Sequence, residues 1–208
     1  MDIAHKWLVI AALAPTLAAA AEPAATQPAL FPAQVSGANI DALFGQQTPV
    51  PAETTNIPLP GINGNAVLHS RVIRAAPGSR AEGRFAYEYR VDLGNATTFV
   101  DSSCVVNLSV KFGPIEKLPY APNSLRDVYE IKQGVPPNQV GFSSAVQTAD
   151  LVTFTFERPV CAATDTTTGD ATFAFGLASR DAPDRGVTVQ IDAIGLDDMR
   201  TKSFGPIR

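Results

Sequence analysis

Side chains that carry much of enzyme chemistry are scarce in this chain of 208 residues, which has two histidines, two cysteines and one tryptophan. The tryptophan and His5 fall in the first 21 residues, a segment with the features of a signal peptide. His69 is the one histidine that remains, and it lies in a predicted strand beside Ser70, where neighbouring side chains point to opposite faces. A serine or cysteine nucleophile needs a histidine or another base, and no G-x-S-x-G motif is present. We therefore predict no catalytic residues and no enzymatic activity.

Clustered positive charge is also missing. The formal net charge is −4, and the densest run of arginines, "SRVIRAAPGSRAEGR", alternates them with small and apolar residues. A protein that binds nucleic acid or anionic lipid needs a basic patch. We therefore predict no nucleic-acid partner.

The chain has one apolar run at its start and no other of similar length. "MDIAHK" is a short positive start, "WLVIAALAPTL" is apolar, and "AAAAE" supplies small residues for a signal peptidase. The apolar run covers residues 7–21 and is shorter than the about 20 residues of a membrane-spanning helix, which argues against a membrane anchor. We predict a signal peptide at 1–21, a secreted or periplasmic protein, and no membrane insertion after cleavage.

The two cysteines are best explained by that compartment. Two thiols in an oxidising environment are expected to form a disulfide, here Cys104–Cys161. A structural zinc site needs about four ligands, which two cysteines and His69 do not supply. We therefore expect Cys104 to stabilise the fold and not to react.

Proline dominates the next segment, residues 22–65. Proline fixes φ and lacks a backbone donor, so this segment is expected to be a proline-rich arm or linker and not a central strand. One stretch within it, "SGANIDALFG", spaces Ile40, Leu43 and Phe44 as one face of a helix near residues 38–44. That helix either covers one end of the domain or docks on a partner.

From residue 66 onward the apolar residues recur with a period of two. The pattern is clear in five stretches and weaker in two: "RFAYEYRVDLG", "DSSCVVNLSVKFG", "LVTFTFE", "TFAFGLAS", "GVTVQIDAIG", and then "AVLHSRVIR" and "DVYEIKQ". Segments rich in Gly, Pro, Asn, Asp and Thr separate them, and no helical pattern lies between them. We predict that residues 66–208 form an all-β domain, a single antiparallel β-sandwich of immunoglobulin-like or jelly-roll kind with about seven to eight strands.

Carbohydrate chemistry has weak sequence support. A glycoside hydrolase needs two acids about 5 to 9 Å apart, and no strand carries an E-x-E or D-x-E pair, although acids from different strands can still meet. A sugar-binding surface usually presents aromatic rings, and only Tyr120 and Tyr129 are expected to be exposed. Tyr87 and Tyr89 align with a core face.

Calcium is the best-supported small ligand. The loops "TDTTTGD" and "SRDAPDRG" provide the hard oxygen donors that calcium prefers, Asp165, Asp170, Asp181 and Asp184. Neither loop matches an EF-hand, and Asp is also a common turn residue. No other cofactor is expected.

These absences favour an exported non-catalytic module with a structural, adhesive or protein-binding role and a protein or extracellular-matrix partner. The alternatives are a small extracellular hydrolase or lyase that acts on polysaccharide, with acids from separate strands, and a calcium-dependent carbohydrate-binding module.

Overall fold

The computed structural model describes residues 28–45, 52–98, 103–121, 124–132 and 138–207. These residues form seventeen strands and one short helix, so the predicted all-β class is confirmed. The finer prediction, a single antiparallel sandwich of seven or eight strands, is wrong. The strands form four sheets, and two pairs of strands, β1 with β10 and β11 with β14, are parallel.

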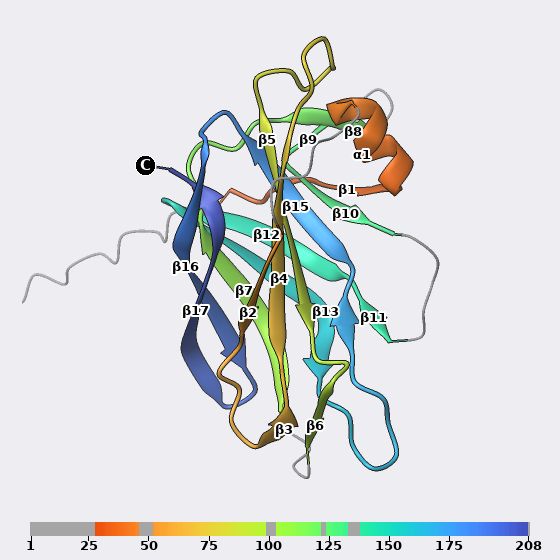
Figure 1. The fold of residues 1–208 in the computed structure, drawn as a ribbon, viewed down its shortest axis with the longest axis vertical. Helices are drawn as coiled ribbons and strands as arrows, with labels where there is room; N and C mark the ends of the chain where they lie inside the picture. The colour runs from red at the N-terminus through yellow and green to blue at the C-terminus, as the bar shows by residue number, and fades with distance from the viewer. Residues whose placement is uncertain (1–27, 46–51, 99–102, 122–123, 133–137, 208) are drawn as a thin grey trace, which may run out of the picture.

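The larger sheet has eight strands in the order β1-β10-β15-β5-β14-β11, with β4 beside β5 and β2 beside β4. Its strands are β1 (Pro32–Val35), β2 (Glu53–Asn56), β4 (Val67–Arg74), β5 (Phe85–Asp92), β10 (Val128–Ile131), β11 (Gln139–Val140), β14 (Ala171–Thr172) and β15 (Ala174–Ser179). The strands β2, β4 and β5 run along the near side of the molecule in Figure 1.

The second large sheet has five antiparallel strands in the order β12-β13-β7-β16-β17. They are β7 (Cys104–Lys111), β12 (Phe142–Thr148), β13 (Leu151–Cys161), β16 (Pro183–Ala193) and β17 (Leu196–Pro206). Two small sheets complete the fold, β3 (Ile62–Gly64) with β6 (Ala96–Thr98), and β8 (Leu118–Ala121) with β9 (Ser124–Arg126).

The two large sheets share one hydrophobic core. The alternating apolar residues of β4 and β5 pack with those of β7, β13 and β16 in a single buried cluster. Phe154 of β13 and Phe175 of β15 have ring centroids 4.7 Å apart, and the buried Tyr89 hydroxyl of β5 donates a 2.9 Å hydrogen bond to the carbonyl of Phe204 in β17. The period-two pattern of the sequence thus places its apolar face in this core.

The helix α1 (Gly37–Phe44) lies where the sequence predicts it and buries the three expected residues, Ile40, Leu43 and Phe44. Ser36 caps it, since its hydroxyl accepts a hydrogen bond from the Asn39 backbone amide while the Asn39 side chain returns to Ser36. The buried side chains form a second cluster with residues from the outer face of the eight-stranded sheet and from β8. The helix therefore covers one end of that face (Figure 1).

Besides α1, the described parts of segment 22–65 contribute the strands β1, β2 and β3 to the sheets. Strands β1 and β2 extend the eight-stranded sheet, and Leu30 donates a backbone hydrogen bond to Ala145 of β12 in the other sheet. The signal peptide expected at 1–21 lies outside the described residues.

The predicted disulfide is confirmed. Cys104 at the start of β7 and Cys161 at the end of β13 are bonded and are direct partners in the antiparallel register. The single helix of the described ranges, α1, is far too short to cross a membrane.

Candidate functional site

A recess lies on the outer face of the eight-stranded sheet, next to α1. It consists of one cavity of about 450 Å³ and another of about 280 Å³, which share the lining residues Arg71, Arg90 and Ala174. We call this recess the β4–β5 groove. Its charged, imidazole and amide side chains are Asp41, His69, Arg71, Glu88, Arg90 and Gln139.

Strand alternation explains why these side chains gather. The residues of β4 and β5 that point away from the core are directly opposed in register, His69 with Arg90 and Arg71 with Glu88. Adjacent strands therefore present a compact block of charged side chains on one face. The helix supplies Asp41 on one side, and β11 supplies Gln139.

Glu88 forms the buried base of the groove. Its side chain is 2% exposed, it is ion-paired with Arg71, and it accepts a 3.0 Å hydrogen bond from the Tyr129 hydroxyl. Burial and then the negative charge of Glu88 raise the pKa of Tyr129, so the phenol stays protonated and donates. Gly176 makes room for this hydroxyl, since a Cβ there would lie 2.8 Å from it.

Arg90 carries an unsatisfied donor. One of its terminal nitrogens, Nη2, lies 3.1 Å from Oδ2 of Asp92, while its Nε is buried and has no hydrogen-bond partner among the described residues. Asp92 also lies 3.8 Å from Nε2 of His69, whose Nδ1 is hydrogen-bonded to Thr54 at 3.0 Å. A buried N–H without a partner is costly. Because this Nε is shielded, the part of Arg90 open to a ligand is the rest of its side chain, which is 41% exposed.

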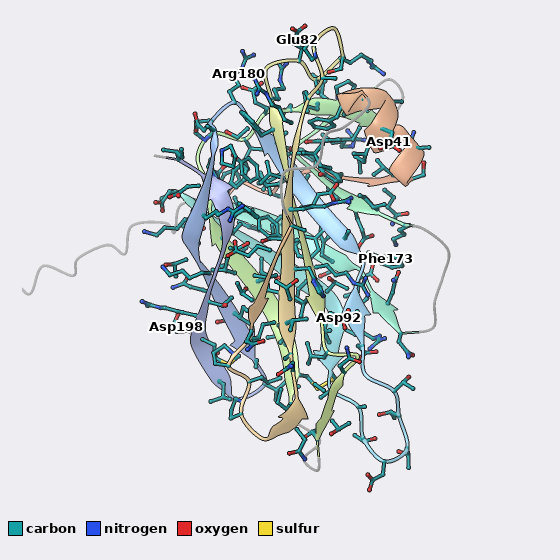
Figure 2. All side chains as sticks on the ribbon, in the orientation of Figure 1. Asp41, Glu82, Asp92, Phe173, Arg180 and Asp198 are labelled. Carbon is teal, nitrogen blue, oxygen red and sulfur yellow. A yellow bond between two sulfur atoms is a disulfide. The ribbon has the colours of Figure 1, made fainter. Side chains whose placement is uncertain are left out.

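Asp41 contributes an acceptor from the opposite side. It is an exposed residue of α1, and its carboxylate has no hydrogen bond or ion pair with the part of the chain that the structure describes. Figure 2 labels Asp41 on the helix and Asp92 farther down the sheet. Hydrogen-bond donors and acceptors thus line both cavities of the groove.

The four aspartates expected to bind calcium are not brought together. Asp165 and Asp170 line a third cavity of about 720 Å³ near the disulfide, while Asp181 and Asp184 lie around the start of β16. Asp170 is held by Arg158 through two hydrogen bonds, of 2.7 and 3.0 Å, and by the Cys161 amide. Within the described ranges no three acidic, histidine or cysteine side chains form a metal-binding group.

Two carboxylates from separate strands do converge, at Glu130 of β10 and Glu157 of β13. A Cβ added to Gly141 would lie 2.8 Å from an oxygen of Glu130 and 2.9 Å from one of Glu157. These oxygens are therefore within about 6 Å of each other, in the range of paired acids in glycoside hydrolases.

Glu130 has little freedom to react. It is buried, accepts a 3.0 Å hydrogen bond from the Phe142 amide, and has Lys132 3.2 Å from its other oxygen. Burial raises the pKa of Glu130, and Lys132 and the Phe142 amide oppose that rise. Sequence reasoning missed this pair because the two strands are neighbours only in the folded chain.

The tyrosines expected to be exposed are buried, which corrects that prediction. Tyr120 is 2% exposed and Tyr129 is 0% exposed, and their ring centroids are 4.7 Å apart. They pack in the cluster that α1 covers, because α1 and β8 bury a face of the sheet that the strand pattern alone leaves open. They form no aromatic surface for a sugar.

The sequence did not predict the groove, although it did show some of the charged residues that line it. The period-two pattern of "RFAYEYRVDLG" places Glu88, Arg90 and Asp92 on the non-core face, and His69 was considered only as a possible base. Comparison with known proteins adds no assignment, since the chain matches no protein-family model, no curated protein and no solved structure.

Proposed function

We propose that this protein is an exported, non-catalytic binding module that holds its ligand in the β4–β5 groove, with a structural or adhesive role outside the cytoplasm. The observation that carries the proposal is that two cavities share the side chains of Arg71 and Arg90, so that two guanidinium groups lie at the centre of one recess. A concave site with a few convergent polar groups is the usual form of a ligand site.

Export is supported by the signal-like start of the chain and by the Cys104–Cys161 disulfide. The mass of protein recovered from outside the cytoplasm tests it. A mass that still includes residues 1–21 would contradict this part of the proposal.

The binding role is tested by filling the groove. Ala174 lines both cavities, so Ala174→Trp should remove ligand-induced rises in melting temperature while the unliganded protein still melts cooperatively. A ligand at a hundredfold its Kd adds about 2.7 kcal/mol, a shift of several degrees. The matched control is Leu125→Trp at an exposed residue outside the groove, which should keep the shifts. Equal responses of the two variants would refute the groove as the site.

The pair Glu130–Glu157 supports a second candidate, a hydrolase acting on polysaccharide. Its spacing suits acid–base chemistry, but both oxygens of Glu130 are engaged, and neither residue lines the β4–β5 groove or the cavity near the disulfide. Release of reducing ends from a polysaccharide by the wild type, and its loss in Glu157→Gln, would favour this candidate over the binding module.

A further inference from the structure

We propose that the ligand of the β4–β5 groove is a hydroxyl-rich neutral saccharide, bound directly by side chains and without a metal ion. This inference rests on the proposed binding function and specifies its ligand. It follows from the mixture of hydrogen-bond donors and acceptors that line the groove.

The groove requires a ligand that both donates and accepts hydrogen bonds. The partly exposed guanidinium of Arg90 can donate, while the exposed carboxylate of Asp41 can accept. The amide of Gln139 can both donate and accept a hydrogen bond. The half-exposed side chain of Arg71 provides a further donor. A sugar hydroxyl donates and accepts at the same time, and neighbouring hydroxyls on one ring can serve two of these side chains together.

A simple anion fits the groove less well because the arginines are already compensated. Arg71 is paired with Glu88 and Arg90 with Asp92. Asp41 adds a third carboxylate on the same recess. Two positive and three negative side chains therefore leave the groove without an excess of positive charge. Such a groove repels a phosphate dianion and does not repel a neutral polar ligand.

A peptide also fits less well. The floor of the groove is the face of β4 and β5, and each of these strands already has neighbours on both of its edges. A bound peptide could therefore not add a strand, which is the way that extended peptides usually gain affinity from a sheet.

The absence of aromatic platforms sets the expected strength. Tyr120 and Tyr129 are buried, so His69 is the one partly exposed ring that lines the groove in the described structure. Without stacking on a sugar face, affinity depends on hydrogen bonds that replace water, each worth about fivefold in Kd. We expect a Kd of about 1 mM for a single chain, equivalent to about −4 kcal/mol.

The test is an NMR titration of the full, oxidised chain with chelator present throughout. The probes are maltohexaose, xylohexaose, mannohexaose, inorganic phosphate and triglycine, each at about ten times a Kd of about 1 mM. At least one hexasaccharide should shift the amide signals of groove residues on β4 and β5. Phosphate and triglycine should not.

Two variants separate a groove contact from surface binding. Arg90→Met should weaken the saccharide at least about tenfold, since it removes a charged donor. Asp41→Asn should weaken it about threefold or more, since the amide oxygen still accepts a hydrogen bond but without the charge. Asp198→Asn on β17, which lies outside the groove, should bind like the wild type. Asp41 is exposed, so Asp41→Asn keeps the test valid if Arg90→Met fails to fold.

The outcomes distinguish the two proposals. Binding of triglycine or phosphate in the groove, with no saccharide bound there, would overturn this inference and leave the binding function intact. Saccharide binding that survives both groove variants would overturn it as well. No probe shifting the groove signals would count against both proposals.

Discussion

At the scale of single residues, the buried carboxylate of Glu88 sets the clearest test of the fold around the groove. Its one ion-pair partner among the described residues is Arg71, whose side chain is 50% exposed. We predict that Arg71→Met lowers the free energy of unfolding by about 2 kcal/mol, because Glu88 would keep only the Tyr129 hydrogen bond for a buried charge. Urea denaturation with unchanged m values measures this loss.

The matched control for Arg71 is another arginine–glutamate pair that lies at the surface. Arg180 is 65% exposed and contacts Glu116, which also accepts a hydrogen bond from Arg84. Arg180→Met should therefore cost less than about 1 kcal/mol. Equal losses in the two variants would mean that the Glu88 pair contributes no more than a surface ion pair.

At the scale of elements, the proline-rich segment contributes structure and does more than link. Phe44 of α1 is fully buried in the second cluster, together with residues of β4, β8 and β10. We predict that Phe44→Ala lowers the free energy of unfolding by about 3 to 5 kcal/mol. We also predict that a chain from which all residues up to and including Gly45 are deleted no longer unfolds cooperatively. Ala42→Ser on the exposed side of the same helix should change stability by less than about 0.5 kcal/mol. Retention of a cooperative thermal transition after the deletion would show that the helix merely rests on the domain.

How much of these elements the sequence predicts depends on the strength of the local pattern. Strands β5, β7 and β13 have clean period-two alternation and were expected, and so was α1 with its three apolar residues. Strand β17 was missed because its exposed side carries charged residues and it pairs with β16 alone. Strand β1 was missed because it begins with Pro32, a position at a sheet edge where a missing donor is tolerated.

The groove could not be predicted for a related reason. Its charges lie on one strand face that the pattern does show, but its base depends on Tyr129 reaching Glu88 from β10 and its wall depends on α1. These contacts join segments far apart in the sequence. Local periodicity carries no information about such contacts. The disulfide was predictable because a chain with two cysteines in an oxidising compartment has one possible pairing.

At the scale of the whole molecule, that disulfide acts mainly on the unfolded chain. Cys104 and Cys161 are register partners on neighbouring strands of the five-stranded sheet, so the folded sheet already holds them together without the bond. Their separation of 57 residues means that reduction frees a long loop when the chain unfolds. We predict that Cys104→Ala/Cys161→Ala lowers the free energy of unfolding by about 4 kcal/mol.

Denaturation in urea measures this loss, and the wild type in reductant is the control that separates loop closure from packing. If loop closure dominates, the reduced wild type and the double variant should unfold at the same urea concentration. Both should also have m values above that of the oxidised protein, because the unfolded chain without the bond exposes more surface. A double variant as stable as the oxidised wild type would contradict the prediction. A reduced wild type clearly more stable than the double variant would instead assign the loss to the packing of the sulfur atoms, since Cys104 is a buried residue.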